Sequence, residues 1–240
     1  MSAKRSETAS VALAAAAVVA AGPAMAAGAA VDDLIAKIKD KDDTVRGEAW
    51  LNGAPAAGAP AVKPLAAVMA DPEFEVARAA RRGLWRITRN VGRPGADADK
   101  KAVVAELLPL LADERPANVK RELMWMVSEL AGDEAVEPVA ALLKDKELRE
   151  DARMVLQRLP GEKSVAALKA GLAAAPEDFK INIAESLRAR RVDVFGLPDQ
   201  RLVPTRKTDL KPLTEAAAKE APKDRPKREG KSQQRKGKAK

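Results

Sequence analysis

The sequence contains no histidine, no cysteine and no tyrosine, and only six of its 240 residues are aromatic. Without histidine the chain has no imidazole base, no Ser-His-Asp triad and no histidine metal ligand. Without cysteine it can form no disulfide, thiolate nucleophile or zinc–thiolate site. With so few aromatic side chains, we expect a core built mainly from Ala, Leu, Val and Ile.

The sequence also lacks the common motifs of enzymes and metal sites. It has no glycine-rich phosphate loop and no dinucleotide fingerprint. Asp40-Lys41-Asp42-Asp43 resembles the start of a calcium loop, but Val45 and Leu51 stand where that loop requires Gly and Glu. No spacing singles out a carboxylate pair for acid–base chemistry. We therefore predict a protein that is not an enzyme, with no catalytic residue, no cofactor and no metal.

The N-terminus has the order of features found in secretory signal peptides. Lys4-Arg5 precedes an apolar run over residues 11–21, and Ala24 and Ala26 fit the small-residue rule for cleavage. The run is shorter than the ~20 residues that a membrane-spanning helix needs. We predict a signal peptide over residues 1–26, cleaved after Ala26, and a periplasmic or extracellular mature chain without a transmembrane span. The alternative is an Ala-rich cytosolic helix or a disordered leader.

An apolar template recurs along the chain with helical spacing. A Val is followed three residues later by Leu or Val, and then by an apolar pair three and four residues further on, except that Lys37 and Gly171 replace the first member of the pair in the first and fifth copies. This i, i+3, i+6/7 pattern indicates one face of a helix rather than a strand. The copies begin at Val31, Val62, Val104, Val136 and Val165.

A turn aspartate and a second helix follow each of the first four copies. Asp stands two residues after the apolar pair, at positions 40, 71, 113 and 145, whereas the fifth copy has Ala174 there. Second helices are expected to begin near residues 45, 76, 119, 148 and 179. Each helix pair has an apolar stripe that it cannot bury alone, so the pairs are expected to stack.

The pattern resembles the HEAT repeat family in its short-repeat form. The features that carry the resemblance are the V-x-P-L first helix, the Asp turn, and an apolar residue followed by a basic one in the second helix, as in Val119-Lys120. It implies an all-α, right-handed α-solenoid over residues 27–197, with repeats near 31–59, 60–95, 101–132, 135–160 and 164–192. Gly53 and Pro55 interrupt the first repeat, and residues 90–100 are expected to be an insertion.

Two sets of charged residues follow from this resemblance. In the family, turn aspartates and the arginines after them pair between repeats, which implies a structural ladder of Asp71, Arg78, Asp113, Arg121, Asp145 and Arg149. Second helices line the concave surface, so a candidate partner-binding face comprises Arg78, Arg82, Arg86, Arg89 and Lys120. Arginine forks suit carboxylate or phosphate. The alternative is a solvated face whose counter-charges are Glu73, Glu75 and the turn aspartates.

The three tryptophans allow two interpretations. Trp50, Trp85 and Trp125 each fall in a second helix. They could form an exposed binding ladder, since Trp is frequent in interface hot spots. The favoured interpretation is that each large ring fills an Ala-rich core.

The net charge of +8 belongs to the C-terminal tail. Residues 198–240 hold 14 basic and 6 acidic side chains, so residues 1–197 are neutral. This tail is rich in Pro and poor in large apolar residues, and we predict that it is disordered. It could bind an anionic envelope polymer or lipid surface, less readily nucleic acid, or serve only as a solubilising tail. The overall prediction is an exported scaffold that binds an unidentified protein partner, with a polyanion or nucleic-acid binder as the alternative.

Overall fold

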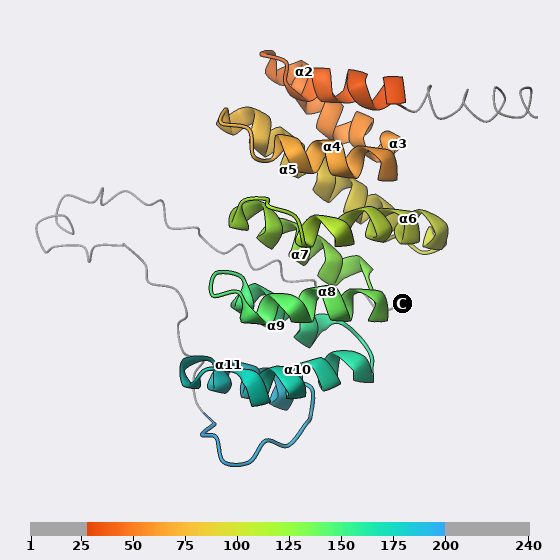
Figure 1. Ribbon diagram of the computed structural model, residues 1–240. Coiled ribbons are helices and arrows are strands. Elements are labelled where there is room, and N and C mark those ends of the chain that lie inside the picture. Colours follow the sequence, from red (N-terminus) through yellow and green to blue (C-terminus); the bar gives the residue numbers. More distant parts are fainter. Residues whose placement is uncertain (1–27, 200–240) are drawn as a thin grey trace, which may run out of the picture. The chain divides into compact units, whose positions relative to one another are not determined.

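The computed structural model describes residues 28–199, and within that range every regular element is a helix (Figure 1). No residue between 28 and 199 is in a strand, so this part of the chain is all-α as predicted. The predicted signal peptide and residues 200–240 of the predicted tail lie outside the described residues. Residues 28–199 all belong to one compact unit.

The helices follow the predicted alternation of first and second helices. Residues 28–38 form a first helix. The later first helices are α4 (Val62–Val68) after η2 (Ala59–Ala61), α6 (Asp97–Leu107) with η3 (Leu108–Leu111), α8 (Val136–Ala141) between η4 (Asp133–Ala135) and η5 (Leu142–Lys144), and α10 (Glu162–Ala174). The second helices are the run α2 (Asp43–Glu48), η1 (Ala49–Gly53) and α3 (Ala54–Ala57), followed by α5 (Phe74–Val91), α7 (Ala117–Leu130), α9 (Arg149–Arg158) and α11 (Glu177–Ala189).

First and second helices form two layers. In the first-helix layer α4 contacts α6, η3 contacts α8, and α8 contacts α10. In the second-helix layer η1 contacts α5, and α5, α7, α9 and α11 contact one another in that order. Successive helix pairs therefore lie against one another along the described range (Figure 1).

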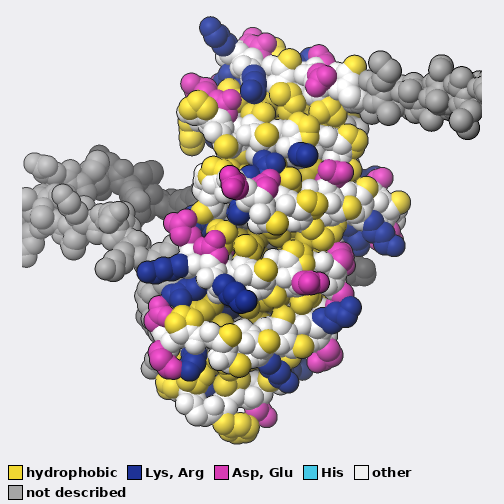
Figure 2. Space-filling model, viewed as in Figure 1, with side chains coloured by type: hydrophobic (Ala, Val, Ile, Leu, Met, Phe, Trp, Pro, Cys, Tyr) yellow, Lys and Arg dark blue, Asp and Glu magenta, His cyan; other side chains and the backbone are white. Residues whose placement is uncertain are grey.

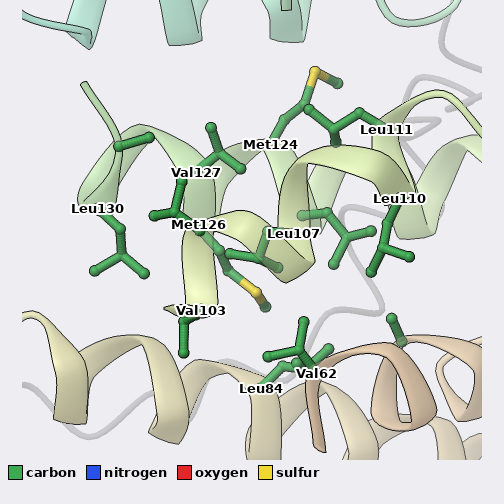
Figure 3. Close-up of a cluster of buried hydrophobic side chains, with 14 of the residues drawn as sticks. Val62, Leu84, Val103, Leu107, Leu110, Leu111, Met124, Met126, Val127 and Leu130 are labelled. Carbon is green, nitrogen blue, oxygen red and sulfur yellow. The ribbon is translucent and has the colours of Figure 1, made fainter. Parts of the chain in front are cut away.

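The core lies between these pairs and is aliphatic, as the composition predicts. Figure 3 shows Val62 and Leu84 of one pair meeting Val103 and Leu107 of the next. Met124 and Met126 of α7 are fully buried, and flexible Met side chains fill irregular gaps well. Phe179 is the one aromatic residue among the largest fully buried side chains of the described range.

The second helix of the first pair continues where Gly53 and Pro55 were expected to interrupt it. The helical run passes from α2 through the π-helical turn η1 into α3. Pro55 lies at the start of α3, directly after the π-helical turn. A Cβ at Gly53 would lie 3.1 Å from Leu34 Cδ1, so glycine allows the π turn to approach the first helix closely.

The expected insertion at residues 90–100 is mostly helical. Asn90 and Val91 complete α5, and residues 97–100 form the first turn of α6, so the connection is only residues 92–96. Gly95 in this connection has φ +81°, a conformation that favours glycine. The long spacing between the second and third copies thus comes from longer helices.

Basic and acidic side chains are interspersed on the face seen in Figure 2. None of the helices between residues 28 and 199 has the length and apolar character needed to cross a membrane.

Candidate partner-binding surface

Helix α5 presents an arginine-rich face away from its buried stripe. Val76, Ala80, Leu84 and Ile87 are buried in the core. Because a helix turns every 3.6 residues, the arginines between these positions fall on the opposite side. Arg81, Arg82, Arg86 and Arg89 are exposed, while Arg78 is half-buried.

Tryptophans and arginines from two neighbouring second helices line an open groove. Its volume is about 450 Å³, and it lies between η1 and α5. The Arg82 guanidinium carbon is 5.2 Å from the centre of the Trp50 ring, and that of Arg89 is 5.5 Å from the Trp85 ring. Both distances fit cation–π contacts. The residues that line the groove are Trp50, Arg81, Arg82, Trp85, Arg86 and Arg89.

One glutamate holds one side of this groove in place. Glu122 of α7 forms an ion pair with Arg81 at 2.9 Å. Its second carboxylate oxygen accepts a hydrogen bond from Trp85 Nε1, also at 2.9 Å. Glu122 therefore balances the charge of Arg81 and fixes the orientation of the Trp85 ring.

Three arginines of the groove have no acidic partner. Arg82, Arg86 and Arg89 form no ion pair with any residue from 28 to 199. Arg78 differs, because it pairs with Glu75 at 2.5 Å. If the face were only solvated, Glu73, Glu75 and the turn aspartates would serve as its counter-charges. Of these acids, Glu75 pairs with Arg78, and none pairs with the other three arginines. The groove therefore holds one arginine paired with Glu122 and three arginines that no ion pair within residues 28–199 balances.

The structure brings together only part of the predicted partner-binding set. Arg82, Arg86 and Arg89 line the groove, whereas Arg78 lies at its edge in a separate ion pair. Lys120 lies in α7 and is not among the lining residues. Arg81, Trp50 and Trp85 complete the groove and were not part of that set.

Of the two tryptophan–arginine contacts in the groove, the sequence could predict only one. Trp85 and Arg89 are four residues apart on one helix, a spacing that places side chains next to each other. Trp50 and Arg82 come from different helix pairs, so the contact between them depends on how the pairs pack.

The tryptophans are neither fully buried nor free at the surface. All three are half-buried, and Trp50 and Trp85 pack against the core. A guanidinium lies over each ring, which for Trp125 is Arg158 of α9 at 5.5 Å. Trp50 and Trp85 thus pack against the core, as the preferred interpretation expects, and also contact arginines of the groove.

The turn aspartates act locally rather than in the expected ladder. Asp71, Asp113 and Asp145 each accept a hydrogen bond from the backbone N–H two residues later, at 3.0, 3.1 and 2.8 Å. This contact stabilises the turn that starts the second helix. Asp113 pairs with Arg115, and Asp71 lies 3.7 Å from Lys39 Nζ. None of the three aspartates forms an ion pair with Arg78, Arg121 or Arg149, so the expected pairing is wrong.

A ladder does connect the second helices, but with other acids. Arg121 pairs with Asp151 at 3.2 Å, and Arg149 pairs with Asp178 at 2.7 Å. Asp151 and Asp178 lie in the first turns of α9 and α11, where a helix favours negative charge. Arg121 also donates a hydrogen bond to the carbonyl of Glu147, in the turn of Asp145, at 3.2 Å.

The aspartates of the calcium-like segment bind backbone amides. Asp40 accepts from the N–H of Asp42, and Asp42 accepts from the N–H of Thr44 as the N-cap of α2. The backbone and side-chain hydrogen bonds from Thr44 lower the pKa of the Asp42 carboxyl. Between residues 28 and 199, no group of three acidic side chains is placed to hold a metal ion.

Comparison with known proteins gives no family for this chain. No protein-family model matches it, and no curated protein matches it either.

Proposed function

We propose that this protein is a non-catalytic scaffold, a HEAT-like α-solenoid that binds an extended acidic segment of a partner protein in the groove of Trp50, Arg82, Trp85, Arg86 and Arg89. The observation that carries the proposal is the set of three arginines without an acidic partner. Such arginines gain charge-assisted hydrogen bonds when carboxylates enter the groove.

The stacked geometry of the groove supports a binding role. Arg82 and Arg89 lie against tryptophan rings, so fewer rotamers are lost when a carboxylate binds their exposed nitrogens. Glu122 restrains Trp85 by accepting the hydrogen bond from its Nε1, so this ring is already positioned in the absence of a ligand. An open groove along the second helices suits an extended chain better than a compact small molecule.

The proposed setting is outside the cytoplasm, after cleavage of residues 1–26. This part of the proposal depends on the sequence alone. There the basic tail would add electrostatic attraction to anionic surfaces, which weakens as salt increases.

The second candidate function is binding of a polyanion such as a single-stranded nucleic acid. One observation favours it: aromatic rings and unpaired arginines alternate in the groove, as in surfaces that stack bases and hold the backbone between them. The charge of the tail would add to that binding.

Binding of a fluorescein-labelled poly-glutamate peptide to the full chain tests the first proposal. In the R82Q/R86Q double variant we expect the affinity to fall by about tenfold or more, because two charge-assisted hydrogen bonds are lost. Fluorescence anisotropy measures the affinity. Tryptophan emission reports on the groove itself, since Trp50 and Trp85 line it.

The matched control is K101Q/K169Q, which removes the same charge from exposed positions on α6 and α10. Equal affinities of the two double variants would contradict the proposal. Tighter binding of oligo(dT) than of the peptide, also weakened by R82Q/R86Q, would favour the second candidate.

A further inference from the structure

A second pocket lies between the last two helix pairs, away from the arginine–tryptophan groove. Its volume is about 590 Å³, and its walls come from α8, η5, α9, α10 and α11. This volume falls within the range of roughly 300–1,000 Å³ that is typical of small-molecule sites.

The walls of this pocket are apolar because α10 carries small residues where it faces η5 and α11. Ala167, Ala170, Gly171 and Ala174 form one wall. A Cβ at Gly171 would lie 2.7 Å from Leu143 Cδ1, so its absence gives Leu143 room in the wall opposite. The buried Phe179 ring and Ile183 also line the space. A hydrocarbon chain would find apolar contacts throughout.

Three cationic side chains line the pocket. Lys144, Lys146 and Arg149 are among the lining residues, and no lining residue is acidic. The two lysines are exposed and form no ion pair within residues 28–199. Asp178 balances part of the charge of Arg149, and the lining residues taken together keep a net positive charge.

Arg149 is the polar group of this pocket that the protein leaves incompletely bonded. Its side chain is only 8% exposed, and its guanidinium lies 4.7 Å from the centre of the Phe179 ring. Nη2 donates to Asp178, whereas Nε is buried with no hydrogen-bond acceptor. A buried donor without a partner is costly, which favours an anion close to this guanidinium.

We propose that this pocket binds a free anionic amphiphile of the fatty-acid class. The carboxylate would lie at Lys144, Lys146 and Arg149, and the alkyl chain would lie against the small-residue wall of α10. The cationic side chains favour an anionic headgroup, and the apolar walls favour an alkyl chain. This site shares no residue with the groove, so the proposal for the pocket can be tested separately from the proposed function.

Dodecanoate below its micelle concentration, titrated calorimetrically into the full chain, is the test. We expect one molecule bound per chain, and binding at least tenfold weaker for dodecanol, which lacks the charge. K144Q/K146Q should weaken dodecanoate binding about tenfold or more, while R82Q/R86Q should leave it unchanged.

A170L/A174L fills the pocket and should abolish binding, whereas its control A166L adds bulk to the same helix outside the pocket. The proposal is wrong if A170L/A174L binds dodecanoate like the unchanged chain. It is equally wrong if dodecyltrimethylammonium binds as tightly as dodecanoate. Binding to phosphatidylglycerol vesicles without any binding of free dodecanoate would also overturn it, since it would indicate a membrane surface contact.

Discussion

Arginine is the most versatile residue of this chain, and its contacts differ from position to position. Arg82 stacks on a tryptophan, Arg121 forms an ion pair with the next second helix, and Arg190 donates to the carbonyls of Leu156, Gln157, Leu159 and Gly161. The planar fork of arginine allows all three contacts, which a lysine ammonium could not replace equally. Arg82, Arg86 and Arg89, which line the groove without an acidic partner in the described range, therefore stand out as candidates for ligand binding.

The N-cap at Asp42 gives a prediction of pH dependence at the scale of one residue. Hydrogen bonds from Thr44 lower the Asp42 pKa, so the stabilisation is present above the ordinary aspartate pKa of about 3.9 and is lost as pH falls through the lower folded value. Asp42→Ala should lower the Tm at pH 7. Circular dichroism melts should show this difference shrinking at acidic pH. A difference in Tm that stays constant down to pH 2 would contradict the assignment.

At the scale of the elements, α9 and α11 are joined by a buried polar network that the sequence did not reveal. Arg153 is 2% exposed and pairs with Glu150, while it also donates to Ser186 of α11. Asn182 donates to Glu150 at 3.1 Å, and Ser186 donates to Gln157 at 2.8 Å. Such a network fixes the register of the last helix pair because each polar group depends on the others.

Removing Arg153 should destabilise the protein strongly. Arg153→Met leaves Glu150 without its main partner, and breaking a buried ion pair in this way costs about 3–5 kcal/mol. Urea unfolding measures the loss. Arg158→Met on the same helix is the control, because it removes an exposed cation–π contact worth only about 0.5–1 kcal/mol. Similar losses in the two variants would show that the network adds no stability.

At the scale of the whole described range, stability is expected to be regional, because helices contact mainly those of the same and adjacent pairs. Ile38 and Leu107 are both fully buried, but Ile38 belongs to the first pair and Leu107 to a central one. Each change to Ala should cost about 2–5 kcal/mol of local stability. Hydrogen exchange should show Ile38→Ala loosening residues 28–57, and Leu107→Ala loosening several pairs.

The first helix pair is where the regional model is tested most directly, by the hydrogen exchange of Ile38→Ala. An apolar groove of about 700 Å³ opens beside Leu34, Val45 and Ala49. Within residues 28–199 this pair has a neighbouring helix pair on one side only, where η1 and α3 contact α5. If Ile38→Ala and Leu107→Ala changed exchange over the same residues, the described range would unfold as a single cooperative unit, and the regional model would be wrong.

The sequence alone determined that the described part is all-α and made of successive helix pairs, because apolar spacing and turn chemistry act within a few residues. It also located the turn aspartates and three arginines of the groove. Packing between pairs decided the rest: the Trp50–Arg82 contact, the acids that Arg121 and Arg149 pair with, and the pocket at Arg149. These contacts join residues some 30 positions apart, as Arg121 and Asp151 do, and depend on the register between helices. No local pattern encodes that register, because it results from how the side chains of neighbouring pairs fit together.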